Sequence, residues 1–300
     1  MFIFLRKLEL TNLILKQNMK KNLMLLAAAV AVMSCSAPKN ETETAPNPVA
    51  ETEVNQIIKT IGMPFKCVGD TAYGAGVTVY QESSAALQWP VKINGNDLKE
   101  LQDTLMSVAL HSADESIDSA LIKYAEQAMW RADSVQLVPV TRAEMLADST
   151  ARIRTQNVNA RIVNLNETAL VYKVEFDAFS GGAHPSYSAE FINYDVRGNK
   201  VLKFDDIFKA DMQDELFELV KKELCERYYV KEVSKLKDVG IFVEDLFLTK
   251  NIYLTPTSVG FFYNPYEISP WAVGVVEVEI PDFMLKDYFT DEAKKIFPIY

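Results

Sequence analysis

The chain of 300 residues offers few side chains for metal or nucleophilic chemistry. Its two histidines, His111 and His184, lie far apart, and no Ser or Cys nucleophile with a recognisable paired base accompanies either of them. Two acids among Asp114, Glu115 and Asp118 would suffice for glycoside hydrolysis, although acidic side chains are also typical of the first turn of a helix. We expect no metal, no cofactor and no catalytic residue, and a hydrolase of peptidoglycan or another glycan, or a deacetylase-related enzyme, is the alternative.

The cysteines suggest an exported protein. Cys35 follows an apolar run, and Cys67 and Cys225 are widely separated, without the CxxC spacing of metal or redox sites. An oxidising compartment would permit a disulfide between Cys67 and Cys225, and two buried free thiols fit the sequence as well.

Two segments combine glycine or proline with aromatic residues. Residues 179–184 read Phe-Ser-Gly-Gly-Ala-His, where the glycines permit a tight or bulged turn that leaves His184 near a strand start. Residues 260–274 hold aromatic side chains in a loop stiffened by two prolines, which is either a recognition surface or a plug of the core. The candidate binding residues are Gly181, Gly182, His184, Tyr263, Asn264, Pro265, Tyr266, Glu267 and Trp271.

Both segments resemble the RsiV-type extracytoplasmic domain, through its aromatic-x-Gly-Gly-Ala-His and Phe-Asn-Pro-Tyr-Glu-Ile-x-Pro signatures. The resemblance covers residues 150–289, and the usual PdaC-like partner domain is similar to residues 63–130. Pro185 stands where relatives commonly have Gly. The family is largely of unknown function and includes a sensing domain of a lysozyme-responsive anti-sigma factor and a non-catalytic part of a peptidoglycan deacetylase. The resemblance implies binding of an envelope protein such as lysozyme, or of cell-wall glycan.

The N-terminal residues predict export. Lys20 and Lys21 precede an uncharged run at 23–33 that ends at Ser34-Cys35, and this run is shorter than the ~20 residues needed to span a bilayer. We interpret residues 1–35 as a lipoprotein signal peptide with the true start at Met19, so that a lipid on Cys35 would anchor the chain to a membrane.

Residues 36–55 are rich in Glu, Thr, Pro and Ala and predict a flexible tether. The acids at Glu41 and Glu43 resemble the export tract of Bacteroidetes surface lipoproteins. We expect a lipid-anchored protein of the cell envelope, in an outer membrane, and the side that it faces, periplasm or cell surface, stays open.

The net charge of −10 argues against a nucleic-acid partner, because phosphate binding requires a basic surface. An acidic surface would attract a cationic partner, or would merely keep the protein soluble.

The hydrophobic pattern predicts an α+β fold of antiparallel sheets with packed helices. We expect two segments joined near Val140, an N-terminal PdaC-like α+β domain at 56–140 and a C-terminal RsiV-like α+β domain at 141–300. Expected strands lie at 63–68, 77–81, 87–93, 152–165, 168–179, 187–196, 201–204, 252–255, 258–263 and 275–280. Expected helices begin after Asn96 or Asp97, after Ser112 or Asp114, and at Asp205 or Asp206.

These observations favour a non-catalytic binding module of the cell envelope. Besides the enzyme, the second alternative is a structural envelope lipoprotein without a small ligand.

Overall fold

The structure is a computed structural model that describes residues 52–113, 116–127 and 134–297. The expected signal peptide, Cys35 and the expected tether up to residue 51 lie outside the described residues. Residues 50–300 belong to one compact unit. In the described part of the chain, no helix has both the length and the apolar composition needed to span a bilayer.

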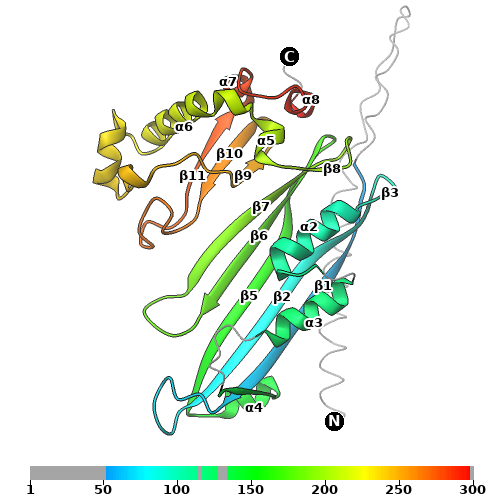
Figure 1. The fold of residues 1–300 in the computed structure, drawn as a ribbon, viewed down its shortest axis with the longest axis vertical. Coiled ribbons are helices and arrows are strands. Elements are labelled where there is room, and N and C mark those ends of the chain that lie inside the picture. Colours follow the sequence, from blue (N-terminus) through cyan, green and yellow to red (C-terminus); the bar gives the residue numbers. More distant parts are fainter. Residues whose placement is uncertain (1–51, 114–115, 128–133, 298–300) are drawn as a thin grey trace, which may run out of the picture. The chain divides into compact units, whose positions relative to one another are not determined.

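A large mixed sheet forms the centre of this unit (Figure 1). Its strand order is β4-β1-β2-β5-β6-β7-β8, and the short β3 pairs with β2. The strands are β1 (Val54–Val68), β2 (Thr78–Ile93), β3 (Asn96–Asp97), β4 (Gln136–Pro139), β5 (Ala151–Leu165), β6 (Ala169–Phe179), β7 (Ser186–Asp195) and β8 (Lys200–Leu202). The α+β class is thereby confirmed. One detail differs, because β2 and β5 pair in parallel.

That parallel pair carries the sheet across the position where we expected two segments to join. Residues 78–87 of β2 lie beside residues 151–160 of β5, so strands from both sides of Val140 share one sheet. Two further boundaries differ from expectation. The runs at 77–81 and 87–93 form the single strand β2, and β1 begins at Val54, within the expected tether.

The hairpin of β5 and β6 follows from side-chain alternation. Val158 and Val174 are buried, while their neighbours Asn159 and Glu175 face the other side of the sheet. Asn166 closes the turn, because its side-chain oxygen accepts hydrogen bonds from the backbone N–H groups of Thr168 and Ala169.

Two helices, α2 (Lys99–Leu110) and α3 (Ile117–Glu126), pack on one face of the sheet (Figure 1). Their buried residues join Leu87, Trp89, Tyr172 and Val174 in one hydrophobic core. The expected caps differ: Asn96 and Asp97 pair with β2 instead, so Leu98 precedes α2, and Ser116 precedes α3. A short helix, α4 (Arg142–Ala147), begins with a capping box between Thr141 and Glu144.

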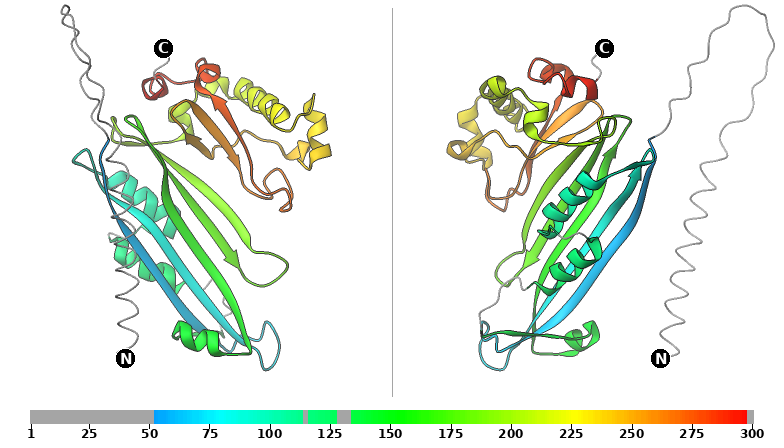
Figure 2. Two further views of the ribbon diagram at one scale, coloured as in Figure 1. Left: turned by 180° about the vertical axis from the view of Figure 1, so that it is seen from behind. Right: turned by 45° about the vertical axis from the view of Figure 1, so that its right-hand side comes forward.

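A second core lies on the opposite face of β6. Alternate residues of this strand enter different cores: Leu170 and Tyr172 join the core under α2, whereas Ala169 and Val171 join the second core. A three-stranded sheet of order β11-β10-β9 covers this face (Figure 2), consisting of β9 (Ile252–Leu254), β10 (Ser258–Tyr263) and β11 (Val276–Pro281). Around it lie α5 (Phe204–Ile207), η1 (Ala210–Met212), α6 (Gln213–Arg227), η2 (Val233–Val239), η3 (Val243–Asp245), α7 (Asp282–Leu285) and α8 (Ala293–Ile296).

The helix expected to begin at Asp205 or Asp206 is interrupted at Phe208. This residue has an extended backbone and forms a bridge with Phe289, which ends α5 before α6 starts at Gln213. α6 buries Leu216, Val220 and Leu224 on one face.

The two cysteines of the described part, Cys67 and Cys225, are free and buried. Cys67 packs with Val79 and Val135, whereas Cys225 is a residue of α6 and lies in the second core. Burial raises the pKa of both thiols. The structure therefore has two separate buried thiols in place of a disulfide.

Candidate binding cleft

A cleft of about 770 Å³ brings together the two segments that the sequence singled out. The loop between β6 and β7 and the adjoining ends of these strands supply one wall, and the loop after β10 supplies Tyr266 and Trp271. The loop after β1 and the start of β5 contribute the remaining residues. The lining residues are Ala72, Tyr73, Arg154, Ala178, Ser180, Gly181, Gly182, His184, Ser186, Tyr187, Tyr266 and Trp271.

His184 is the junction between the two segments. Its ring stacks on the Trp271 indole with a centroid distance of 4.1 Å and an interplanar angle of 17°. Its Nε2 lies 3.2 Å from the hydroxyl of Tyr266, and its Nδ1 lies 2.9 Å from the carbonyl oxygen of Pro185. Both ring nitrogens are therefore engaged, and the imidazole is held in one orientation.

The glycine pair shapes the turn before His184, as the sequence predicted. Gly181 has a φ of +98° and Gly182 a φ of +108°, a region that L side chains rarely adopt. The hydroxyl of Tyr73 donates a 2.5 Å hydrogen bond to the carbonyl oxygen of Ser180. A Cβ atom on Gly181 would overlap this hydroxyl, so glycine also makes room for Tyr73.

The loop that carries Tyr266 is rigidly built. Tyr266 has a φ of +73°, which is rare for a bulky residue, and its N–H donates to the carbonyl oxygen of Ser269 at 2.9 Å. The carboxylate of Glu267 accepts a 2.7 Å hydrogen bond from the N–H of Asn264. This strained turn projects the exposed ring of Tyr266 toward His184.

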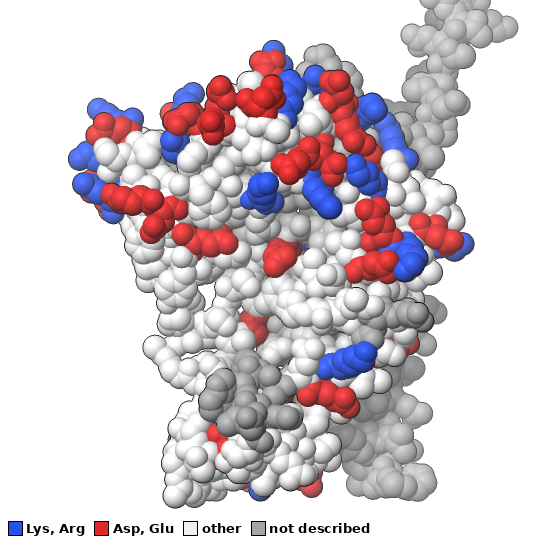
Figure 3. All heavy atoms as spheres, in the orientation of Figure 1, with Lys and Arg blue, Asp and Glu red and all other residues white. Residues whose placement is uncertain are grey.

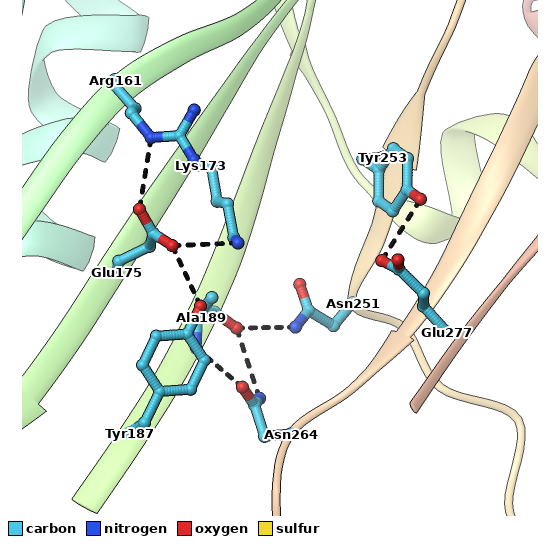
Figure 4. A network of polar contacts seen from close by, with 9 residues as sticks. All are labelled: Arg161, Lys173, Glu175, Tyr187, Ala189, Asn251, Tyr253, Asn264 and Glu277. Atoms are coloured by element: carbon cyan, nitrogen blue, oxygen red, sulfur yellow. Dashed lines mark hydrogen bonds and ion pairs between the residues drawn. The ribbon is translucent and has the colours of Figure 1, made fainter. Parts of the chain in front are cut away.

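Asparagine side chains fasten this loop and the small sheet to β7 (Figure 4). The side-chain oxygen of Asn264 accepts a 2.7 Å hydrogen bond from the N–H of Ala189. The carbonyl oxygen of Ala189 accepts hydrogen bonds from the side chains of Asn264, at 3.3 Å, and Asn251, at 2.8 Å. Asn193 of β7 makes a corresponding pair of hydrogen bonds with β9. Its side-chain nitrogen donates to the carbonyl oxygen of Ile252, and its side-chain oxygen accepts from the N–H of Leu254. These amides replace strand-to-strand bonds and fix the distance between the two sheets.

A charged network stands behind Tyr187, on the cleft wall. The carboxylate of Glu175 accepts a hydrogen bond from the Tyr187 hydroxyl at 3.0 Å and pairs with Lys173 at 2.9 Å and with Arg161 at 3.2 Å (Figure 4). Burial alone would raise the pKa of Glu175, but the hydrogen bonds from Lys173 and Tyr187 outweigh it and lower the pKa. The network holds Tyr187 in place at neutral pH.

A buried ion pair stands at the inner end of the cleft. Arg154 and Asp70 lie 2.6 Å apart with nearly inaccessible side chains. The guanidinium of Arg154 lies 5.4 Å from the centre of the Tyr73 ring. Burial alone would lower the pKa of Arg154, but hydrogen bonds with Tyr73 and Asp70 raise it, so the pair stays ionised.

The cleft is therefore aromatic, polar and free of net charge. None of its lining residues is Asp, Glu or Lys, and its one Arg is paired with Asp70. Within residues 52–113, 116–127 and 134–297, no group of three or more His, Cys, Asp or Glu side chains could hold a metal ion. Such a surface suits a ligand with flat apolar faces and hydrogen-bonding edges.

The structure divides the candidate residues into two sets. Gly181, Gly182, His184, Tyr266 and Trp271 meet in the cleft. Tyr263, Asn264, Pro265 and Glu267 support the loop instead: Tyr263 is buried and donates to the carbonyl oxygen of Phe247, and Pro265 is half-buried.

Sequence reasoning missed Tyr73, Arg154 and Tyr187. Tyr73 stands beside Gly74 in a loop, which was the one local signal for it. Of the acids considered for hydrolysis, Asp118 pairs with Lys59 at 2.6 Å, and Asp114 and Glu115 lie outside the described residues.

Comparisons with known proteins agree with this architecture. Residues 205–282 match a family model described as protein of unknown function (DUF3298). A crystal structure of a DUF3298 family member from Bacteroides fragilis superposes with a TM-score of 0.58 and 23% identity, covering 82% of this chain and 96% of that one. A DUF3298 family protein from Pseudomonas aeruginosa gives a TM-score of 0.53 and 15% identity, covering 82% and 98%. At these identities, the likeness concerns the fold.

Among curated proteins, the chain is similar to immunogenic protein MPT64 of Mycobacterium tuberculosis and to immunogenic protein MPB64 of Mycobacterium bovis. Each is 30% identical over 115 residues, which are 38% of this chain and 48% of the relative. The chain thus spans about half the length of the curated relatives it matches. Tyr266 and Trp271 lie within residues 205–282, which match the DUF3298 family model, whereas His184 precedes this segment.

Proposed function

We propose that the protein is a non-catalytic binding module of the cell envelope whose cleft holds an uncharged segment of glycan. The observation that carries this proposal is the stack of His184 on Trp271, with Tyr266 alongside, in a cleft lined by no carboxylate and no lysine. The family resemblance implies either cell-wall glycan or an envelope protein such as lysozyme as the ligand. The lack of net charge in the cleft favours the glycan there.

The chemistry of a sugar ring matches this surface. A pyranose has apolar C–H faces that pack on aromatic rings, and hydroxyl or amide groups at its edges that need hydrogen-bond partners. Tyr266 and Trp271 are exposed and can provide the faces, while Ser180, Ser186 and the N–H groups of the glycine turn can provide the partners.

The absence of catalysis is part of the same proposal. Glycoside hydrolysis uses two carboxyl groups that flank the bond, and general base catalysis needs a base that is free to accept a proton. The cleft is lined by neither Asp nor Glu, and both nitrogens of His184 already lie within hydrogen-bonding distance of Pro185 and Tyr266. The ligand should therefore be bound and released unchanged.

Isothermal titration calorimetry with an oligomer of N-acetylglucosamine tests the proposal. We expect saturable binding that changes little with ionic strength, because the ligand carries no charge. Trp271→Ala should weaken binding at least ~10-fold, equivalent to about 1.4 kcal/mol. Tyr229→Ala, which removes an exposed ring elsewhere, is the control. Absence of binding, or equal binding by the Trp271 variant, contradicts the proposal, and mass spectrometry should find the oligomer unmodified.

A second surface favours a cationic protein ligand. A groove between α6 and β11 of about 790 Å³ is lined by Glu223, Glu226, Glu277 and Glu279, with Arg227 as its basic residue. Charged side chains of both signs gather over α6 and its neighbours (Figure 3). Lysozyme bound there should be released by salt, and Glu277→Gln together with Glu279→Gln should weaken binding. Lysozyme that fails to bind at low ionic strength removes this candidate.

The location in the envelope is also a proposal, supported by the lipobox-like sequence that ends at Cys35. Cys35→Ser should move the protein from the membrane fraction to a soluble fraction. Protease treatment of intact cells then separates the two orientations, because a surface protein is digested and one that faces the periplasm is protected.

A further inference from the structure

Among the strands of the described residues, none pairs with the outer edge of β1 over most of its length. β4 pairs with β1 only from Phe65 to Val68, and no other described strand lies on this side (Figure 1). The carbonyl oxygen of Pro64 accepts a hydrogen bond from the N–H of Val140, so the backbone of Pro64 faces this edge. Because backbone groups alternate along a strand, Gln56, Ile58, Thr60 and Gly62 present their N–H and C=O groups there as well.

Apolar side chains accompany this edge on both faces of the sheet. Ile58 is 64% exposed on one face, and Ile57 is 46% exposed on the face that carries the helices. On α3, Asp118 reaches Lys59 of β1, and Ile122, one turn later on the same side of the helix, is 49% exposed. Three isoleucines thus surround a row of backbone donors and acceptors.

The charge pattern favours a second copy of the chain as the partner. When a strand pairs antiparallel with the same strand of a second copy, side chains near the twofold axis lie close to their counterparts in that copy. An unpaired charge there would be repelled by the same charge on the second copy. Between Val54 and Pro64 the sole charged residue is Lys59, which is already neutralised by Asp118 at 2.6 Å within the same chain. A bulge between Asn55 and Gln56 and the ring of Pro64 bound the free stretch, which leaves Gln56 to Met63 available.

We propose that two copies of the chain associate through β1, antiparallel to each other, to form one continuous sheet. The twofold axis then lies perpendicular to the sheet, α3 of both copies stands on the same face, and Ile57, Ile58 and Ile122 of each copy are covered. The proposal is independent of the ligand of the cleft. A dimer would present two clefts to one polymer and strengthen binding through avidity.

Sedimentation velocity of the purified protein over a range of concentrations tests this interface. We expect a reversible dimer that Ile58→Lys weakens at least ~10-fold, because a charge replaces an apolar side chain that the second copy would cover. Phe283→Lys is the matched control, since Phe283 is 63% exposed but lies on α7, and it should leave the dimer intact. A monomer at all concentrations, or a dimer that Ile58→Lys does not weaken, overturns the proposal.

Hydrogen exchange gives a second readout that needs no variant. The amides of Ile58, Thr60 and Gly62 should exchange more slowly as protein concentration rises, because pairing buries them, whereas those of α6 should not respond. Amides that are equally protected at the lowest concentration would mean that another part of the same chain covers the edge. That result, or amides that stay unprotected at every concentration, overturns the proposal.

Discussion

The His184 ring stacks on the Trp271 indole with a centroid distance of 4.1 Å, although the loops that carry the two residues join strands of different sheets. This contact joins the turn after β6 to the loop after β10. The contact requires that both loops are held in position. The glycine turn places His184, and the asparagine hydrogen bonds to Ala189 place the loop that carries Trp271.

Alanine at either turn glycine should cost stability, but only one substitution should disturb the cleft. Gly181→Ala and Gly182→Ala should each lower the free energy of unfolding by about 1–3 kcal/mol, because both positions have positive φ. Gly181→Ala also displaces the Tyr73 hydroxyl, whereas a Cβ on Gly182 meets open space. Calorimetry should show a larger loss of ligand affinity for Gly181→Ala. Equal losses would refute the role assigned to Tyr73.

The buried pair of Arg154 and Asp70 should be strongly coupled. Asp70→Asn should destabilise the protein by about 3–5 kcal/mol, because it leaves the buried guanidinium without its counter-charge. Arg154→Met should behave similarly, and the double variant should be less destabilised than the sum of the two. Chemical denaturation of all four proteins measures this difference, and additive losses would show that the two side chains act independently.

Asn264 should hold the aromatic loop against β7. Asn264→Asp replaces the N–H₂ group that donates to the Ala189 carbonyl with an oxygen, so the free energy of unfolding should fall by about 1–3 kcal/mol. The Ala189 amide should exchange faster with solvent. Asn159→Asp on the exposed face of β5 is the matched control, and unchanged exchange at Ala189 in the Asn264 variant would contradict the account.

Acid should remove the contribution that the ionised Asp148 carboxylate makes to the stability of the folded protein. Hydrogen bonds from Thr150, and from the Tyr80 hydroxyl, lower its pKa from 3.8 to about 2. Because the folded-state pKa lies below the unfolded one, the contribution is complete above about pH 4 and is lost as pH falls toward 2. Asp148→Asn should therefore show a smaller fall in Tm between about pH 5 and about pH 2 than the wild type.

Asp214→Asn on the surface of α6 is the control for that comparison. A fall in Tm that is the same for the wild type and the Asp148 variant would contradict the assignment.

Local patterns predicted most strands and the α+β class, because alternation and helical spacing depend on neighbouring residues. The β5–β6 hairpin is an example, since one face of each strand is apolar and a single Asn closes the turn. The break at Phe208 was not predictable, because its cause is a bridge to Phe289, which is distant in sequence. The parallel pairing of β2 with β5 has the same origin, since no local signal selects it.

The same distinction applies to the cleft. Gly181, His184 and Trp271 stood out because each lies in a segment of unusual local composition. Tyr73 reaches Ser180 across 107 positions, and Arg154 reaches Asp70 across 84, so only the folded chain brings them to the site. Asn264 appeared to be a binding residue for the opposite reason: its setting is aromatic and loop-like, yet its amide is used by the backbone of β7.

Nuclear magnetic resonance of the tryptophan indole groups tests the central claim most directly. During titration with an N-acetylglucosamine oligomer, the indole N–H signal of Trp271, assigned with Trp271→Phe, should shift until the cleft is saturated. The signal of Trp89, buried under α2, should stay in place. A Trp271 signal that does not move at saturating oligomer would contradict a glycan-binding cleft at this position.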